Sequence, residues 1–143
     1  MDFQDFLECV RKAKKEQPIL FGLPQDQPVS APELAEFEES MGIRLSPKYR
    51  ELLLQFGGGF FGFASVYSLD RQSEFYLGVH NPAPLHGYLC IADNGCGDCY
   101  VQKIADGACQ EPLYFLDHET EELQKTRYAD ILEYLICKGL QQS

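Results

Sequence analysis

The sequence contains no tryptophan, and its basic residues are few. Only 12 Lys and Arg stand against 22 Asp and Glu, so the formal net charge is −10. A chain with this charge repels the phosphate backbone of nucleic acids and attracts basic proteins. The composition therefore argues against direct nucleic-acid binding and fits a basic protein as the partner.

Long hydrophobic runs are missing as well. No segment approaches the ~18 apolar residues of a membrane-spanning helix, and residues 1–5 lack the basic and apolar regions that open a secretory signal. We therefore expect a cytoplasmic protein that makes no membrane contact. Because cytosolic redox buffers keep thiols reduced, the six cysteines are expected to be mostly free.

The chain does contain enough apolar surface for one core. Hydrophobic residues make up 45% of its 143 residues, and ten Phe and eight Tyr are spread along it, which excludes the composition of a disordered chain. At this length roughly two-thirds of the unfolded surface can be buried without disulfides. We expect a single domain over residues 1–143.

The N-terminus is predicted to be helical. Phe3, Phe6, Leu7 and Val10 repeat with helical spacing, and Pro18 closes this first helix. The glycine and prolines of the next ten residues predict a flexible stretch.

Two capped helices are expected to follow. Ser30 and Glu33 have the spacing of a capping box, and Gly42 ends the helix that they begin. Ser46, followed by a proline, is expected to cap the next helix, which stops at the triple glycine 57–59.

Strands are predicted after the triple glycine, because aromatic and β-branched residues become frequent and turn signals separate short runs. The predicted strands cover residues 60–69, 75–79, 88–92, 99–104 and 113–116, with a loop at 80–84. A last helix is predicted from the apolar stripe on Tyr128, Ile131 and Leu135, with Thr126 as its cap and Gly139 as its end.

This succession predicts an α+β fold. The connections between the strands are too short for helical crossovers, so the sheet should be antiparallel. N-terminal helices and a C-terminal helix should flank it.

Four stretches then carry a family resemblance. Residues 33–49 (ELAEFEESMGIRLSPKY) and 52–59 (LLLQFGGG) look like a helix, a short passage ending in Tyr, and an apolar helix with a glycine turn. Residues 90–100 (CIADNGCGDCY) and 112–119 (PLYFLDHE) look like two strands around a G-x-G-D turn and a strand ending in D-H-E. In this order and spacing they resemble the SUKH superfamily, most clearly over residues 30–137. That superfamily groups fungal cell-wall-synthesis regulators with bacterial toxin-immunity proteins.

The resemblance implies an intracellular immunity protein that binds a cognate toxin domain, expected to be a basic nuclease-like effector, and neutralises it by protein–protein contact. The alternative is a regulatory scaffold that binds several endogenous proteins. Side chains at predicted strand ends and turns are the candidates for partner contact. They are Asp70, Glu74, Tyr76, Asp93, Asp98, Asp117 and Glu119.

A third reading is a zinc-binding domain. Cys96 and Cys99 form one C-x-x-C pair, and Cys90 and Cys109 are close enough in sequence to complete four ligands. Zinc ribbons usually bring two such pairs, so ordinary strand cysteines are the favoured interpretation, and no cofactor is expected.

Catalytic motifs are not found. The sequence has no G-x-S-x-G elbow, and His80, His86 and His118 have no Ser or Cys partner that the sequence reveals. We therefore expect no enzyme and assign no catalytic residues.

Overall fold

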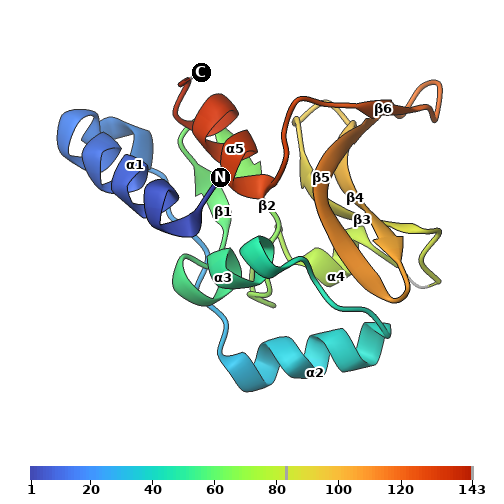
Figure 1. Ribbon diagram of the computed structural model, residues 1–143. Coiled ribbons are helices and arrows are strands. Elements are labelled where there is room, and N and C mark those ends of the chain that lie inside the picture. Colours follow the sequence, from blue (N-terminus) through green and yellow to red (C-terminus); the bar gives the residue numbers. More distant parts are fainter. Residues whose placement is uncertain (83, 143) are drawn as a thin grey trace.

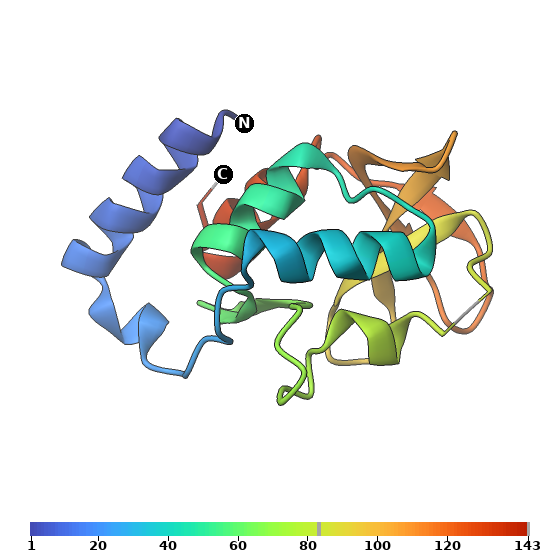
Figure 2. The ribbon, with the colours of Figure 1, turned by 90° about the horizontal axis from the view of Figure 1, so that it is seen from below.

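The computed structural model describes residues 1–82 and 84–142 and confirms the α+β class with an antiparallel sheet. Its helices are α1 (Phe3–Glu16), α2 (Ala31–Met41), α3 (Pro47–Gln55), α4 (Leu77–His80) and α5 (Ile131–Tyr134), together with a 3-10 turn at Pro18–Phe21 and a π-helical turn at Leu135–Gly139. Its strands are β1 (Gly59–Phe61), β2 (Ala64–Val66), β3 (Tyr88–Asp93), β4 (Cys99–Ala105), β5 (Ala108–Leu116) and β6 (Leu123–Lys125). Figures 1 and 2 show α1 at the end of the molecule away from the main sheet.

The main sheet has the strand order β3-β4-β5-β6, and every neighbouring pair is antiparallel. The partners Cys99 and Leu116 bring the β3–β4 turn and the β5–β6 turn to the same end of the sheet. β1 and β2 form a separate hairpin. Among the described residues, no helix is both long and apolar enough to cross a lipid bilayer.

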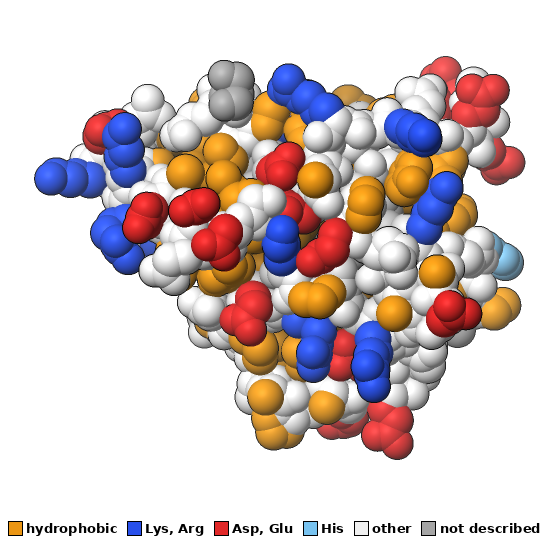
Figure 3. Space-filling view, viewed as in Figure 1, with side chains coloured by type: hydrophobic (Ala, Val, Ile, Leu, Met, Phe, Trp, Pro, Cys, Tyr) orange, Lys and Arg blue, Asp and Glu red, His pale blue; other side chains and the backbone are white. Residues whose placement is uncertain are grey.

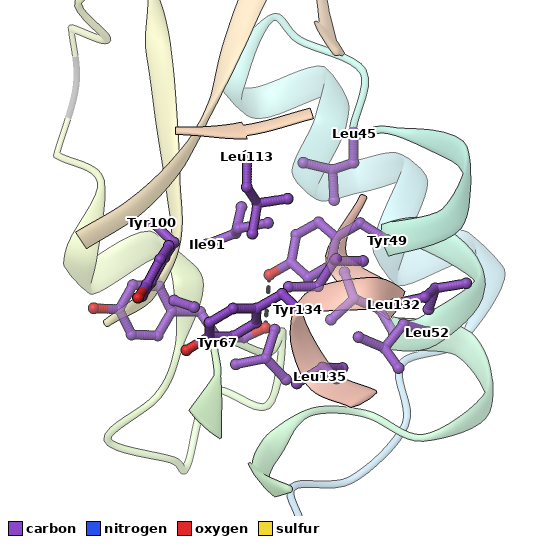
Figure 4. Close-up of a cluster of buried hydrophobic side chains, with 14 of the residues drawn as sticks. Leu45, Tyr49, Leu52, Tyr67, Ile91, Tyr100, Leu113, Leu132, Tyr134 and Leu135 are labelled. Atoms are coloured by element: carbon purple, nitrogen blue, oxygen red, sulfur yellow. Dashed lines mark hydrogen bonds between the residues drawn. The ribbon is translucent and has the colours of Figure 1, made fainter. Parts of the chain in front are cut away.

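The core lies between the sheet and the helices. Tyr49 of α3 is completely buried there, and its hydroxyl donates a hydrogen bond to the Tyr67 carbonyl at 2.6 Å (Figure 4). Leu52, Leu132 and Leu135 surround it from α3 and the C-terminal helical segment (Figure 4). The hydroxyl of a buried tyrosine requires such a partner, so this bond fixes α3 against the chain that follows β2.

The predicted first helix is confirmed as α1, and its apolar face packs against the rest of the protein. Phe6 of α1 is fully buried and stacks on Phe61 of β1, with ring centroids 5.6 Å apart. The stretch after it is tied to the rest of the chain, because Asp26 donates its N–H to Gly58 and Val29 donates to Leu53.

The capping box of α2 is confirmed in part. The Ser30 hydroxyl accepts the Glu33 N–H at 3.3 Å, and Gly42 ends the helix with φ +69°. The Glu33 carboxylate, however, accepts a bond from the Ser30 hydroxyl rather than from the Ser30 backbone.

One predicted cap is confirmed in position without a side-chain cap bond, and the other is wrong. Ser46 does precede α3, but its buried hydroxyl donates to the Gln102 side chain at 2.9 Å and makes no cap bond, which links α3 to β4. At the last helix the cap is Asp130, whose carboxylate accepts the Glu133 N–H. Thr126 instead donates its hydroxyl to the Leu113 carbonyl.

The strand predictions for 88–92, 99–104 and 113–116 are confirmed as β3, β4 and the second half of β5. The predicted strand at 60–69 is a hairpin, because Gly62 turns the chain between β1 and β2. The predicted strand at 75–79 is wrong, since the helical turn α4 occupies most of it, and β6 was not predicted. Ala83 of the predicted loop lies outside the described residues.

Candidate protein-binding face

An open groove of about 640 Å³ lies where the β1–β2 hairpin, the β3–β4 turn and the C-terminal helix meet. Five of the residues that line it are aromatic. The aromatic side chains that line it are Phe60, Phe63, Phe75, Tyr100 and Tyr134. Two charged side chains, Asp93 and Lys138, stand at its rim. A groove of this kind can receive apolar side chains of a partner and offers a charge of either sign beside them.

Asp93 connects the groove to the core. One carboxylate oxygen accepts the Tyr67 hydroxyl at 2.7 Å, and the other accepts the Gly95 N–H at 2.9 Å. Burial of the Tyr67 ring, together with this bond, raises the pKa of Tyr67 far above its ordinary value. Asp93 is therefore held in one orientation at the groove rim.

Asp98 joins the two neighbouring turns of the sheet. One of its oxygens accepts both the backbone N–H and the Nδ1 of His118, at 3.0 and 2.6 Å, and the other accepts the Asn94 amide. These hydrogen bonds lower the pKa of Asp98 to about 2. The bond to Asp98 also raises the pKa of His118. Asp98 thus remains a carboxylate at any physiological pH.

The β5–β6 turn carries the densest negative charge of the face. Asp117 accepts the Glu119 N–H and thereby shapes the turn, whereas the side chains of Glu119, Glu121 and Glu122 are exposed. None of these four carboxylates has a Lys, Arg or His within ion-pair distance among the described residues. Acidic side chains gather over this turn, and the basic side chains of α1 lie at the opposite end of the molecule (Figure 3).

The structure brings four of the seven predicted contact residues to this end of the sheet, namely Asp93, Asp98, Asp117 and Glu119. The other three lie between β2 and α4. Asp70 accepts the Gln27 and Gln72 N–H groups, and Glu74 is exposed. Tyr76 packs edge-on against Phe37 of α2, where it lines a second groove of about 290 Å³. The predicted residues therefore belong to two surfaces.

The four candidate zinc ligands are not gathered. Cys99 pairs with Leu116 at one end of β4, while Cys109 lies beside Ile104 at the other end. Cys90 is buried, and its contact with Cys99 raises its pKa while lowering that of Cys99; burial raises the pKa of Cys109 to about 12. Cys96 lies in the β3–β4 turn and is exposed.

Within residues 1–82 and 84–142, only one group of three or more His, Cys, Asp or Glu side chains is close enough to share a cation. It consists of Asp98, Asp117 and His118. The sequence pattern does not indicate that these three side chains form a group. Asp98 accepts a hydrogen bond from His118, and Asp117 accepts one from the Glu119 N–H. The first bond joins the β3–β4 turn to the β5–β6 turn, and the second stabilises the β5–β6 turn.

The groove aromatics and Lys138 were not among the predicted site residues. Phe63 follows Gly62 at the hairpin tip and is 72% exposed, which no local sequence pattern indicates. Phe60 and Phe75 form an edge-to-face pair with centroids 5.0 Å apart. A run of aromatics next to a glycine was the only available signal.

Comparison with known proteins identifies a family for most of the chain. The family model described as the SMI1 / KNR4 family (SUKH-1) matches residues 28–136, which leaves α1 outside the match. A search of curated proteins gives no significant match. Since the family model covers well over half of the chain, the protein belongs to the SMI1 / KNR4 family (SUKH-1).

Proposed function

We propose that this protein is an immunity protein that binds a cognate toxin domain and neutralises it by direct contact. Membership of the family fits an immunity or regulatory role in general, and the family is generally non-catalytic. The observation that supports the finer proposal is the set of carboxylates without ion pairs on the β5–β6 turn. Asp98 joins this turn to the β3–β4 turn, which lines the aromatic groove.

Two kinds of interaction would bring a basic partner to this surface, one at long range and one on contact. Unpaired carboxylates steer a basic protein at distances up to a Debye length, and aromatic side chains supply short-range contact area. A toxin that acts on nucleic acid needs a basic surface for the phosphates of its substrate. An acidic protein that covers this surface prevents the substrate from approaching, so inhibition requires no chemistry by the immunity protein.

The test begins with affinity purification of the tagged protein from its native host. A single stoichiometric basic partner with an effector domain supports the proposal, provided that the protein also abolishes the partner's toxicity on co-expression. Several substoichiometric partners, with no protection, would contradict it.

The contribution of the turn is then measured with a charge variant. In Glu119→Gln/Glu121→Gln we expect association with that partner to slow by roughly fivefold to tenfold at low salt. The matched control is Glu8→Gln/Glu39→Gln, which removes one exposed charge from α1 and one from α2. An equal loss in both variants would show that only net charge matters.

One feature favours the alternative of a regulatory scaffold. The groove beside Tyr76 is separate from the aromatic groove and is lined by Val29, Phe37 and Leu69. Two separate hollows allow two different proteins to bind at once. The same purification decides between the two functions through the number and stoichiometry of the partners.

A further inference from the structure

Three large hydrophobic side chains are exposed close together near the C-terminal helix. Ile19, Leu23 and Phe63 are 87%, 54% and 72% exposed, and we call them the hairpin patch. Phe63 lines the aromatic groove together with Leu23. It also lines a hollow of about 660 Å³ together with Ile19. Contiguous exposed apolar surface of this kind marks interaction sites on soluble proteins.

The backbone around Phe63 is fixed. Its N–H donates to the Gly139 carbonyl at 2.9 Å. Gly62 has φ +59°, and a Cβ at that position would overlap the Gly139 carbonyl oxygen. The hairpin tip therefore rests directly on the backbone of the C-terminal helix, and Phe63 projects away from it. The backbone of the hairpin tip therefore needs little further ordering when a partner packs on Phe63.

One acidic side chain, Asp93, and one basic side chain, Lys138, line the groove, and Asp93 is the one that can bind a cation. Asp93 stands at the rim of the groove, and each of its oxygens accepts one hydrogen bond, which leaves a second lone pair for an incoming cation. Asn94, also at the rim, donates to Asp98 and so connects the groove to the acidic turns. A second copy of this chain is disfavoured, because each copy has a net charge of −10.

We propose that the groove beside Phe63 receives a basic segment of a partner protein. An apolar residue of the segment packs on Phe63, and a flanking Lys or Arg reaches Asp93. The proposal rests on the proposed function, since it specifies where and by what chemistry the partner docks.

The probe is a pair of synthetic capped peptides, Lys-Leu-Lys-Phe-Lys and its acidic counterpart Glu-Leu-Glu-Phe-Glu, titrated to millimolar concentration into ¹⁵N-labelled protein and followed by NMR. We expect saturable shifts of the Phe63, Gly95 and Lys138 amides with the basic peptide and none with the acidic one. Shifts confined to the β5–β6 turn, equal binding of both peptides, or no saturable shift in the groove would each overturn the proposal.

The variant test compares two exposed hydrophobic residues. Phe63→Ser should weaken binding of the basic peptide by roughly fivefold to tenfold. Val79→Ser is the matched control, because Val79 is 71% exposed and lines neither hollow. It should leave the affinity unchanged, and an equal loss in both variants would contradict a role for Phe63. The dispersed spectrum of each free variant verifies that it is folded.

The failure of this proposal can be told apart from failure of the immunity function. If no toxin partner is found and the basic peptide still binds in the groove, the immunity function fails and the docking chemistry stands. If a toxin partner is found whose affinity is the same for Phe63→Ser and for the unaltered protein, the docking proposal fails and the immunity function stands.

Discussion

At the scale of single residues, the pair Asp98 and His118 joins the β3–β4 turn to the β5–β6 turn. These two turns carry Asp93, Asp98, Asp117 and Glu119, and we call them the acidic face. Hydrogen bonds from the backbone and ring of His118 lower the pKa of Asp98 to about 2. The bond to Asp98 raises the pKa of His118. The ion pair is therefore complete where both groups are charged, from above the lowered pKa of Asp98 up to the raised pKa of His118.

The lowered pKa of Asp98 and the raised pKa of His118 determine how the stability of the protein changes with pH. The contribution of His118 to stability is fully present below its unfolded pKa of about 6.5 and is lost as the pH rises through its raised folded pKa. The contribution of Asp98 is present above its unfolded pKa of about 3.9 and is lost as the pH falls through about 2. We expect Asp98→Asn to return the pKa of His118 toward its ordinary value, measured by NMR titration of the ring. Asp106→Asn, in the β4–β5 turn, is the control; a His118 pKa that is the same in all three proteins contradicts the ion pair.

Asp130 combines a helix cap with a buried ion pair. Its side chain is 1% exposed, accepts the Glu133 N–H at 2.9 Å and lies 2.8 Å from the Lys48 ammonium. Burial alone would raise the pKa of Asp130, but the hydrogen bonds from Lys48 and the Met1 amino group outweigh it, so the pKa is lowered.

Two substitutions separate these roles. Asp130→Asn keeps an oxygen for the cap and removes the charge, so we expect a loss of about 1–2 kcal/mol in the free energy of unfolding. Asp130→Ala removes both and should lose about 2–4 kcal/mol. Urea unfolding at neutral pH measures both values. Equal losses would mean that the cap contributes nothing, and no loss in either variant would refute the buried pair.

At the scale of elements, the triple glycine forms the corner between α3 and the β1–β2 hairpin. Gly57 has φ +94°, and a Cβ there would overlap the Asp26 carbonyl oxygen. Gly107, in the β4–β5 turn, has φ +75° with open space around it. Both conformations disfavour a side chain, by about 1 kcal/mol.

Comparing alanine substitutions at Gly57 and Gly107 isolates the cost of the close approach between Gly57 and Asp26, because both glycines have positive φ. We expect Gly107→Ala to lose about 1 kcal/mol and Gly57→Ala at least about 3 kcal/mol, because only Gly57→Ala also forces two backbone segments apart. Chemical denaturation at equilibrium measures both. If the two losses agree, the corner relaxes without resistance, and the contact with Asp26 is not a constraint.

Elements with strong local signals could be predicted from the sequence, and elements formed by distant contacts could not. Ser30 and Gly42 fix α2 through bonds within the helix, so its limits follow from local pattern. α4 is a single turn whose first residue, Leu77, donates to the Ser68 carbonyl. Phe75 and Tyr76 just before it and Val79 within it favour a strand. Hydrogen bonds such as Leu77 N–H to Ser68 and Val79 N–H to Tyr76 form the helical turn instead. The exposed residues 123–125 become β6 because they pair with β5.

The candidate binding face likewise contains residues that local sequence patterns indicate and residues that only distant contacts place there. Asp93, Asp98 and Asp117 could be found because antiparallel hairpins return their alternate turns to one end of the sheet. Phe63 could not be found, because its exposure results from the contact between Gly62 and Gly139, which are far apart in the chain. Nor does any local pattern indicate that Ser46 donates to Gln102 rather than capping its helix.

At the scale of the whole molecule, the net charge of −10 opposes folding through self-repulsion. Few of the carboxylates are compensated, because the described residues contain only two ion pairs with Lys or Arg, Lys48–Asp130 and Arg50–Glu38. Raising the NaCl concentration from about 0.01 to about 0.1 M shortens the Debye length from about 30 to about 10 Å. Repulsion between turns and helices that are further apart than this is then screened, whereas the buried pair at Asp130 is affected little.

We therefore expect the unfolding temperature to rise by roughly 2–4 °C over that range of NaCl, which corresponds to about 1 kcal/mol for a chain of this size. Differential scanning calorimetry measures it, and KCl should give the same rise because the effect depends on ionic strength. Glu36→Gln/Glu39→Gln removes two exposed charges of α2, so it should be more stable than the unaltered protein at low salt and respond less to added salt. A fall in unfolding temperature with salt would mean that favourable ion pairs outweigh the repulsion. The carboxylates of the acidic face would then be paired within the protein, and no excess negative charge would remain for a basic partner to neutralise.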